Sequence, residues 1–371
     1  MQAMMGIITG TKSEELLKEI TQHRCMAAVP FGGRYRLIDF ILSNMVNSGV
    51  RNVAVTTSHN YRALLDHLGS GKEWGLDRKS EGLVILPSAS PSIFRRTLRF
   101  DLKDLYANFD YLEKSRQRYV LLSGNNMVCN LNFKKVLEFH KLKGANLTVV
   151  YKVENNTYAD LSGCTFLEIE DDGRVSSVNN IPNKIDPNNI SMEMLVMERV
   201  FLMELIRVAL ASGNWDLSEI IANNISEIMV YAYPFNGYLG KIKSVANYYR
   251  HSMELLNPEI SSELFSGYGP IYTKTKDGPP TRYSSECNVN NSMVASGCSI
   301  DGTVEGSIIF RGVSVGNGTF IKDSIIMQKS TIEDNVILHN VILDKEVIIR
   351  KGTVLKGQVG QPIIIGKKNI I

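Results

Sequence analysis

A six-residue spacing of apolar side chains in the C-terminal part of the chain constrains its fold more than any other feature. Aliphatic residues recur six positions apart, often followed by Gly, Asp or Glu, in the pairs Val294 and Ile300, Ile309 and Val315, Ile326 and Ile332, Ile342 and Ile348, and then at Val354. Hexapeptide repeats of this kind predict a left-handed parallel β-helix, whose three-sided coils point their aliphatic residues inward. A sandwich of short strands would show a period of two instead.

The first part of the chain, to about residue 250, follows a different pattern, in which short apolar runs alternate with segments of helical periodicity. The predicted strands include 6–9, 52–57, 83–87 and 147–153. Strands that alternate with helices are typical of a largely parallel sheet with helices on both faces. The sequence therefore predicts an α/β domain of the doubly wound, Rossmann-like kind.

The organisation of the chain follows from where these patterns change. Between about 160 and 245 the alternation loosens into predicted hairpins, one turning at 171–173, and one apolar helix within 198–211. Residues 264–286 break all periodicity and are rich in glycine and proline, which is typical of a linker. The chain of 371 residues is long enough for two cores. We predict an α/β domain over 1–255, a linker over 256–286 and a β-helix domain over 287–371.

Charge and cysteine content narrow the classes of partner. The 41 Lys and Arg residues nearly balance the 38 Asp and Glu residues, the net charge is +3 and no Lys/Arg-rich run is present, so no nucleic-acid partner is expected. The five cysteines are scattered and never reach CxxC spacing, which argues against a disulfide framework and a zinc site. No apolar run approaches the length of a membrane span and no signal-like segment is present. We therefore expect a soluble, cytoplasmic protein without a membrane partner.

Four stretches of the chain resemble one enzyme family. They are AAVPFGGRYRLIDFILSNMVNSGVRNVAVTT (27–57), HLGSGKEWGLDR (67–78), SMEMLVM (191–197) and VYAYPFNGYL (230–239). With the hexapeptide β-helix behind them, the chain resembles the glucose-1-phosphate adenylyltransferases, also called ADP-glucose pyrophosphorylases, over essentially its whole length. The resemblance implies a nucleotidyltransferase-like domain and a role in glycogen biosynthesis, where the family makes ADP-glucose from ATP and glucose-1-phosphate. Such a transfer concentrates negative charge on phosphoryl oxygens and depends on positioning and on cations.

The residues that the family uses for this chemistry are replaced in this chain. The glycine-rich nucleotide loop of the family aligns with 11–16, where no glycine remains, two glutamates would repel a triphosphate and Leu16 stands at the arginine position. The two aspartates that hold Mg²⁺ in the family align with Asn125 and Lys241. An amide adds no negative charge and an ammonium repels a cation, whereas Mg²⁺ requires hard oxygen ligands.

Two further family motifs are replaced as well. The lysine that binds the sugar phosphate aligns with Ile181, and the segment beside the nucleotide aligns with 100–104. The chain is thus similar to non-catalytic subunits of this family, which keep the scaffold without the catalytic residues. The resemblance implies no metal, no cofactor and little or no activity of the chain alone. It also implies a hetero-tetramer in which a GlgC-type homologue is the catalytic subunit and this chain is the regulatory or structural subunit.

Other functions are open at the level of sequence. The chain could be an active or weakly active sugar-phosphate nucleotidyltransferase, or a module that senses ATP or a sugar phosphate without turnover. Lys241 is either a solvated lysine or a cation that takes the place of the metal, and Asn125 also fits a strand-end amide that caps the next turn. His339 fits the base of a hexapeptide acyltransferase, although a lone histidine in a solenoid is more often a surface residue.

Arginines predict an anion or effector site. The glycine pair at 32–33 precedes Arg34 and Arg36, which fits an anion site at a helix N-terminus, or a glycine turn in which Asp39 pairs with one arginine. The densest basic cluster consists of Arg95, Arg96 and Arg99. This cluster fits either a site for a phosphorylated sugar or nucleotide effector, or a solvated loop face.

Overall fold

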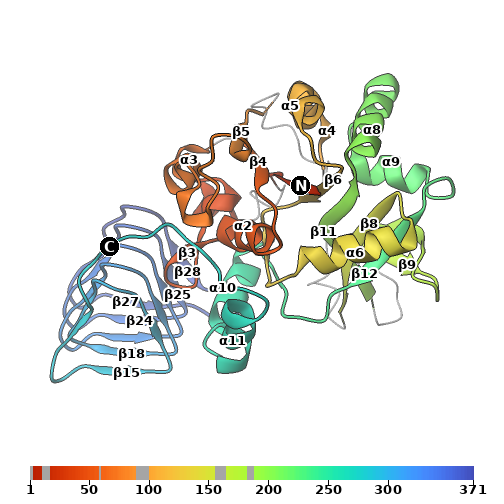
Figure 1. Ribbon diagram of the computed structural model, residues 1–371. Coiled ribbons are helices and arrows are strands. Elements are labelled where there is room, and N and C mark those ends of the chain that lie inside the picture. The colour runs from red at the N-terminus through yellow and green to blue at the C-terminus, as the bar shows by residue number, and fades with distance from the viewer. Residues whose placement is uncertain (1–2, 11–16, 58–59, 89–99, 155–163, 182–187) are drawn as a thin grey trace.

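A mixed sheet forms the centre of the first domain in the computed structural model, which describes residues 3–10, 17–57, 60–88, 100–154, 164–181 and 188–371 (Figure 1). The main strand order is β10-β9-β11-β6-β1-β4-β5, with β8 beside β11 and β12 beside β8. The strands are β1 (Met4–Ile8), β4 (Asn52–Thr56), β5 (Gly82–Leu86), β6 (Tyr119–Ser123), β8 (Leu147–Glu154), β9 (Phe166–Ile169), β10 (Val175–Asn179), β11 (Asn188–Glu198) and β12 (Val230–Pro234).

Most strands of this sheet run in one direction, and β11 is reversed between β6 and β8. Strands β1, β4, β5 and β6 are parallel, as predicted. The prediction of a largely parallel sheet is confirmed, with β11 as a reversed strand, because β11 runs antiparallel to both β6 and β8 while β12 runs parallel to β8. Strands β9 and β10 form the predicted antiparallel hairpin, which turns at 171–173 with Gly173 at a φ of +86°. The carboxyl ends of β6 and its parallel neighbours still form one edge, where ligands bind in folds of this kind.

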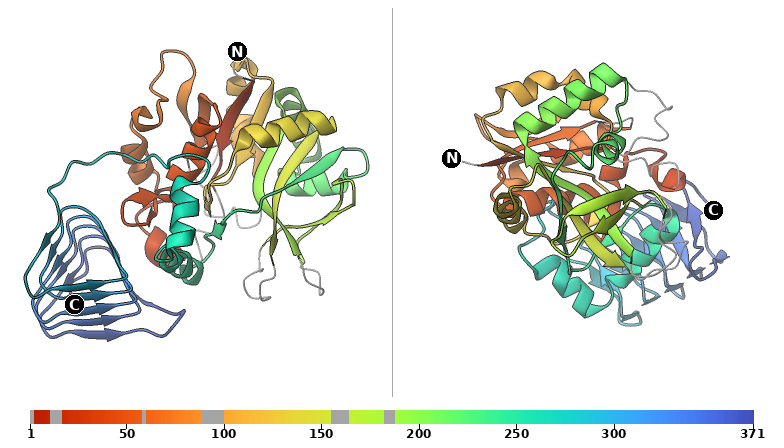
Figure 2. Two further views of the ribbon diagram at one scale, coloured as in Figure 1. Left: turned by 60° about the horizontal axis from the view of Figure 1, so that its bottom comes forward. Right: turned by 90° about the vertical axis from the view of Figure 1, so that its right-hand side faces the viewer.

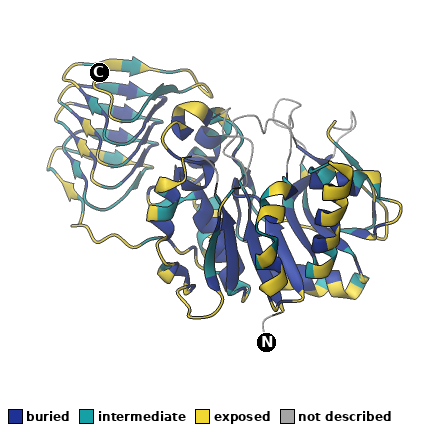
Figure 3. Ribbon diagram, turned by 90° about the horizontal axis from the view of Figure 1, so that it is seen from above, coloured by how far each residue is buried: buried dark blue, intermediate teal, exposed yellow. Residues whose placement is uncertain are grey.

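Helices cover both faces of the sheet and bury two apolar cores (Figure 1). One core is covered by α2 (Leu37–Asn47), α3 (Arg62–Leu68) and α6 (Phe133–Lys143). The other core is covered by α4 (Leu102–Ala107), α5 (Phe109–Lys114), α8 (Arg199–Ser212) and α9 (Leu217–Asn223). Figure 3 shows the same division, with buried strands between helices whose outer faces are exposed. This confirms the predicted α/β class and the predicted apolar helix, which is α8.

Local sequence signals set the ends of several helices. The side chain of Asn132 accepts hydrogen bonds from backbone N–H groups in the first turn of α6, and that helix ends at Gly144 in the left-handed conformation. Asp101 and Asp216 begin α4 and α9 in the same manner. Short elements complete the domain: α1 (Lys18–Thr21), β2 (Pro30–Phe31), β3 (Tyr35–Arg36), β7 (Met127–Val128) and β13 (Gly240–Lys241). In the described part of the chain, no helix has both the length and the apolar character that a membrane span needs.

The C-terminal domain is the predicted left-handed parallel β-helix (Figure 2). Three parallel sheets of five strands each form its sides, in the orders β14-β17-β20-β23-β26, β15-β18-β21-β24-β27 and β16-β19-β22-β25-β28. The strands are β14 (Arg282–Tyr283), β15 (Asn288–Asn290), β16 (Met293–Val294), β17 (Ser299–Ile300), β18 (Thr303–Glu305), β19 (Ile308–Ile309), β20 (Ser314–Val315), β21 (Phe320–Lys322), β22 (Ile325–Ile326), β23 (Thr331–Ile332), β24 (Ile337–His339), β25 (Val341–Leu343), β26 (Ile348–Ile349), β27 (Val354–Lys356) and β28 (Ile363–Ile365).

The sequence period and the observed coils agree in the first coils and diverge in the last. The core of the β-helix contains Ile309, Val315, Ile321, Ile326, Ile332, Leu338, Leu343, Ile349 and Leu355. These residues follow one another at spacings of six, six and five, so a strict six-residue count slips by one position. The predicted inward residues Ile342, Ile348 and Val354 each lie one position before the core residue, and Val354 is 53% exposed. A shift of one residue turns a strand side chain to the opposite face.

The β-helix packs against the α/β domain through a third apolar cluster. Helices α10 (Val245–Glu254) and α11 (Pro258–Ser266) lie at this junction (Figure 1). Ile308, Ile325 and Ile342 face outward from the β-helix and are buried in the same cluster as Phe40 and Tyr248. Both predicted linker boundaries differ from the structure, because α11 occupies the start of 256–286 and β14 already belongs to the first coil. The connection without regular helix or strand is 267–281.

Candidate functional site

The candidate site lies where β6 ends at the edge of the sheet. The chain continues from β6 into Gly124, Asn125 and Asn126, and both asparagines are buried. The backbone N–H of Gly124 donates to the carbonyl of Glu193, which lies on the antiparallel neighbour β11. The Asn126 Nδ2 donates to the carbonyl of Ile242 at 3.1 Å, while the backbone N–H of Ile242 donates back to the Asn126 carbonyl at 2.9 Å. These bonds hold the asparagine turn against the segment that follows β13.

Lys241, at one of the two positions that align with the metal-binding aspartates of the family, is part of an ion pair. Lys241 lies on β13, which pairs with β7 directly after the asparagine turn. Its Nζ lies 2.9 Å from the Oε1 of Glu193, and the two side chains are only 11% and 12% exposed. Glu193 has a φ of +55° at an irregularity in the pairing of β11 with β8. That irregularity turns the carboxylate toward β13, so Lys241 is not a solvated lysine.

The donor set at this position does not fit a divalent cation. Asn125 supplies an amide and Lys241 supplies an ammonium, and the nearby carboxylate of Glu193 is already in an ion pair with that ammonium. Mg²⁺ requires near-octahedral coordination by hard, largely anionic oxygen ligands. The Oδ1 of Asn126 is a buried oxygen without a hydrogen-bond partner in the described residues, but one neutral oxygen cannot balance a divalent charge beside an ammonium.

A second lysine adds positive charge to the same region. Lys243 lies two residues after Lys241 along the chain, and its Nζ is 3.2 Å from the Sγ of Cys164. Burial lowers the pKa of Lys243, and the Lys241 charge lowers it further, while Cys164 and Glu193 raise it. Lys243 thus adds a partly buried amine beside the Lys241–Glu193 ion pair.

The structure locates some of the other predicted positions and not others. Leu16, at the expected arginine position of the nucleotide loop, lies outside the described residues. Ile181 follows strand β10 and is 75% exposed. Its aliphatic side chain offers no polar group to a sugar phosphate. Within 100–104, the Asp101 carboxylate accepts a hydrogen bond from the backbone N–H of Lys103 and begins α4. The structure gives this segment a helix-capping role.

The predicted anion motif at 32–36 forms a tight turn. Gly32 and Gly33 have φ values of +55° and +76° and connect β2 to β3. The expected pairing of Asp39 with an arginine side chain is wrong. One Asp39 carboxylate oxygen lies 2.6 Å from the Nε2 of His67, and the other accepts the backbone N–H of Arg36 at 2.9 Å. The guanidinium of Arg36 instead donates to the Ala63 carbonyl.

Arg34 and Arg36 face basic residues of the linker and the β-helix, and together they form what we name the interdomain cationic cluster. Its members are Arg34, Arg36, Lys276, Arg311 and Lys345. Burial lowers the pKa of Lys345 to about 7, with further lowering by the charges of Arg36 and Arg24. Burial also lowers the pKa values of Lys276 and Arg311, each with a contribution from a neighbouring arginine of the cluster. The other arginines of the predicted anion or effector site, Arg95, Arg96 and Arg99, lie outside the described residues.

Sequence reasoning missed several of these residues. Glu193 lies 48 positions before its partner Lys241, and no local motif connects them. Lys276, Arg311 and Lys345 are spread over the linker and two coils. The side chain of His339, for which an acyltransferase base was the alternative to a surface residue, is 37% exposed, and its Nε2 lies 3.4 Å from the Oδ2 of Asp323.

Two family models match the chain. The model described as "Nucleotidyl transferase" matches residues 7–255, and the model described as "GlmU-like, C-terminal hexapeptide" matches residues 280–360. The first covers the α/β domain, including β6, β11 and β13, and the second covers the β-helix.

Named relatives match nearly the whole chain. The glycogen biosynthesis protein GlgD of Bacillus subtilis (strain 168) is 38% identical over 98% of this chain and 96% of its own length. GlgD of Geobacillus stearothermophilus is 40% identical over 86% of this chain and 82% of its own length. A glucose-1-phosphate adenylyltransferase of Bacillus cereus is 28% identical over 94% of this chain and 93% of its own length. The similarity therefore extends across both domains.

Proposed function

Because this chain belongs to the nucleotidyl transferase family, with the GlgD proteins among its relatives, we propose that it acts in glycogen biosynthesis as a non-catalytic subunit. In this proposal it is the regulatory or structural partner of a catalytic, GlgC-type glucose-1-phosphate adenylyltransferase. The two chains form a hetero-oligomer that makes ADP-glucose from ATP and glucose-1-phosphate, in the cytoplasm. The chain alone has little or no activity.

The observation that carries this proposal is the ion pair between Lys241 and Glu193 beside Asn125. Adenylyl transfer needs cations that neutralise the charge on the phosphoryl oxygens. In this cleft the fixed ammonium would repel a metal ion, and the neighbouring carboxylate is engaged by that ammonium. The cleft is thereby stable without a metal, which supports a subunit whose fold serves assembly instead of chemistry.

A subunit of this kind acts through differential contact with its partner. If it packs better against one conformer of the catalytic subunit, it shifts the population toward that conformer. Coupling free energies between sites are typically about 1–3 kcal/mol, which corresponds to changes of roughly 5–150-fold in affinity. We therefore expect the catalytic subunit to change in substrate affinity, maximal rate or effector response when this chain is added.

The decisive experiment mixes this chain with the catalytic homologue. Maximal rate, apparent substrate affinity and effector response are measured for the homologue alone and for the co-purified complex, whose mass gives the stoichiometry. We expect co-purification and a change in at least one of the three quantities. Two proteins that do not associate, or an associated pair with unchanged kinetics, would refute the regulatory role.

The rival function is an active transferase, and a second assay separates it. Purified chain is incubated with ATP, Mg²⁺ and glucose-1-phosphate, and pyrophosphate release is compared with a blank. We expect no release above the blank. Turnover by this chain alone would mean that the lysine and amide do not abolish the chemistry.

A second candidate function is the binding of an anionic effector, and the interdomain cationic cluster favours it. Lys276 belongs to the linker while Arg311 and Lys345 belong to the β-helix, so an anion bound there would contact both domains and the connection between them. Binding of phosphate groups by several convergent cations is strengthened by their charge. We propose that a sugar phosphate or nucleotide binds this cluster and biases the relative position of the two domains.

Calorimetry with ATP, glucose-1-phosphate and inorganic phosphate tests the effector site. We expect Arg311→Ala to weaken binding of the anion that binds, and the exposed Lys356→Ala on β27 to leave it unchanged. Equal affinities for the wild type and Arg311→Ala would remove the cluster as the binding site.

A further inference from the structure

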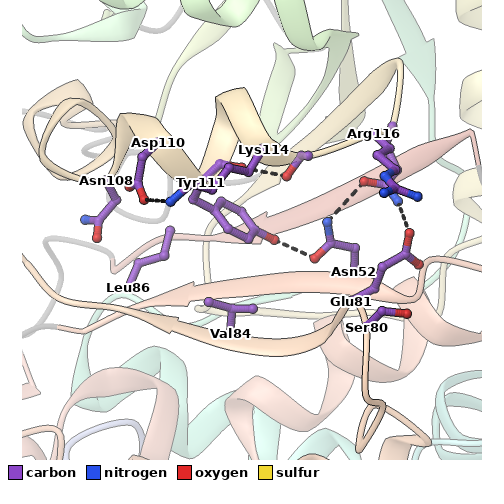
Figure 4. Close-up of a pocket in the computed structure, with 12 residues that line it drawn as sticks. Asn52, Ser80, Glu81, Val84, Leu86, Asn108, Asp110, Tyr111, Lys114 and Arg116 are labelled. Carbon is purple, nitrogen blue, oxygen red and sulfur yellow. Dashed lines mark hydrogen bonds and ion pairs between the residues drawn. The ribbon is translucent and has the colours of Figure 1, made fainter.

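A large pocket lies at the opposite end of the parallel strands from the asparagine turn. It has a volume of about 530 Å³ and opens between helix α5 and the neighbouring strands β4 and β5, of which β5 is the edge strand (Figure 4). Asn52 is the first residue of β4, Glu81 directly precedes β5, and Gln117 lies shortly before β6. The pocket thus begins at the amino ends of strands whose carboxyl ends lead to the candidate site. Its volume is within the range of small-molecule sites.

A chain of hydrogen bonds fixes the polar wall of this pocket (Figure 4). The Tyr111 hydroxyl donates to the Asn52 Oδ1 at 2.8 Å, the Asn52 Nδ2 donates to the Gln117 Oε1 at 3.1 Å, and the Gln117 Nε2 donates to the Glu81 Oε1 at 2.8 Å. Asn52 is 5% exposed and Gln117 is 2% exposed. Burial raises the pKa of Tyr111, with a smaller contribution from Glu81, so the hydroxyl keeps its proton. The wall is therefore preorganised.

The charges around the pocket cancel. Lys114 and Asp110 form an exposed ion pair with 2.9 Å between Nζ and Oδ2, and the other two charged lining residues, Arg116 and Glu81, carry opposite charges. A phosphorylated ligand would meet as much negative as positive charge here, unlike at the interdomain cationic cluster. A cation would also gain nothing. The balance favours a neutral ligand.

The remaining lining fits a ligand that has both hydroxyl groups and an apolar face. The side chains of Val84 and Leu86 on β5 supply the apolar part, beside the ring of Tyr111. Ser80 and Asn108 also line the pocket and are more exposed than the buried wall, and their hydroxyl and amide groups can exchange hydrogen bonds with sugar hydroxyls. A pyranose ring presents C–H groups on one face and hydroxyls at its edge, which matches this division.

Because the pocket combines polar groups, an apolar part formed by Val84 and Leu86, and balanced charge, we propose that it is a binding site for a neutral hexose unit. Its assignment to the glucose units of an α-glucan rests on the proposed function in glycogen biosynthesis. The site would hold the polymer, or its free end, near the complex that supplies the sugar nucleotide. The nucleotide cleft is not required for this binding.

The test measures binding of maltotetraose and of glucose to this chain alone by saturation-transfer NMR and calorimetry. Ser80 lies at the mouth of the pocket and is exposed, so Ser80→Trp should fill the pocket without removing a hydrogen bond of its wall. Lys79→Trp places the same bulk next to the pocket on an exposed residue that does not line it, and serves as the matched control. Equal melting temperatures of the two variants establish that both are folded.

We expect maltotetraose to bind the wild type and Lys79→Trp alike, and Ser80→Trp at least about tenfold more weakly, a difference of ~1.4 kcal/mol. Excess glucose-1-phosphate should not displace maltotetraose. Tighter binding of maltotetraose than of glucose supports a glucan end, and equal binding supports a free hexose. No saturable binding of either sugar, or equal binding by Ser80→Trp, would overturn the proposal.

A further outcome would assign the pocket to a protein partner. If neither sugar binds and Ser80→Trp, but not Lys79→Trp, loses co-purification with the catalytic homologue, the pocket is a subunit contact and the carbohydrate proposal is wrong. Because sugar binding is measured on this chain alone, its failure is distinguishable from a failure of the regulatory role, which is measured on the mixture.

Discussion

Lys241 and Glu193 show how two side chains far apart in the sequence determine the character of a cleft. Their charges are nearly withdrawn from solvent, and each is compensated by the other at 2.9 Å. Removing one member of such a pair leaves a poorly solvated charge, whereas removing both does not. The pair therefore serves the stability of the folded chain, whatever ligand the neighbouring cleft holds.

The Lys241→Ala substitution tests this role. We expect it to lower the free energy of unfolding by ~2 kcal/mol, less than for a fully buried pair because both side chains retain some solvent contact. The Lys241→Ala/Glu193→Ala double variant should lose less than Lys241→Ala alone, in denaturant titrations at pH 7. Losses that simply add would show that the two charges are not coupled.

Lys345 makes the stability of the folded chain dependent on pH. Its pKa is about 7 in the folded protein, against an ordinary value of 10.5, because of burial and the charges of Arg36 and Arg24, with Lys276 adding to and Asp344 opposing the shift. Between these values the unfolded chain holds a proton that the folded chain has lost. The contribution of this group therefore favours folding increasingly as pH rises from about 7 to 10.5.

A Lys345→Met variant should remove this dependence. Below pH 7 both states of the wild type are protonated and the full cost of confining the charge is present. We expect the variant to be more stable than the wild type by at least ~1.4 kcal/mol at pH 6, the equivalent of one pKa unit, with the difference shrinking toward pH 10. Thermal unfolding at several pH values measures this, with the exposed Lys356→Met as control. A difference that is constant with pH would contradict the assignment.

At the scale of elements, one side of the β-helix has two sets of buried aliphatic side chains. One set fills the core of the β-helix, and the other packs against the α/β domain. Ile309 and Ile326 point into the solenoid, while their neighbours Ile308 and Ile325 face the α/β domain. Strands β19 and β22 are therefore apolar on both faces, unlike strands with one solvated face. The five-residue step at one corner of each coil keeps both sets in register from coil to coil.

A cavity in one coil should weaken the stack. Ile326 is fully buried, and we expect Ile326→Ala to cost ~2–4 kcal/mol, through lost apolar burial and the cavity left behind. The matched control is Val354→Ala on β27, which is half-exposed and should change stability by less than ~0.5 kcal/mol. Denaturant unfolding of the full chain compares them. Similar losses for both variants would place Val354 inside the coil, as a strict six-residue count predicts.

At the scale of the whole molecule, polar contacts join the β-helix to the α/β domain inside an apolar junction. Nη2 of Arg24 donates to both carboxylate oxygens of Asp344, at 2.8 and 3.0 Å, and both side chains are 3% exposed. The hydroxyl of Tyr249 donates to the carbonyl of Asp323 and also contacts Asn340. Such contacts fix one relative position of the domains, because any displacement would leave buried polar groups without partners.

Arg24→Met should loosen the junction. It leaves the Asp344 carboxylate without its buried guanidinium partner, and we expect a loss of ~3 kcal/mol and faster proteolysis within the connection 267–281. The double variant Arg24→Met/Asp344→Leu should recover part of that stability. Melting curves and limited proteolysis measure both effects. An unchanged melting temperature with unchanged proteolysis would show that the apolar cluster alone holds the domains together.

The sequence by itself determined the features that depend on local periodicity. The two domain classes and helix α8 followed from the spacing of apolar residues, because a side chain's face is set by its position in a helix or strand. The hairpin followed from the Asp-Asp-Gly turn at 171–173. The positions of Asn125 and Lys241 followed from the resemblance, since they lie in segments whose neighbours match the family. The prediction that the site lacks catalytic residues stays a prediction until activity is measured.

Only the tertiary structure decided which residues meet. The antiparallel placement of β11 brings Glu193 to Lys241. The docking of the β-helix brings Arg311 close to Arg34 and Lys345 close to Arg36. A periodic count also could not find the five-residue corner that moved the inward position from Ile342 to Leu343. Local patterns report the face of each element, whereas the partner of a charged side chain depends on chain topology and on packing between segments far apart in the sequence.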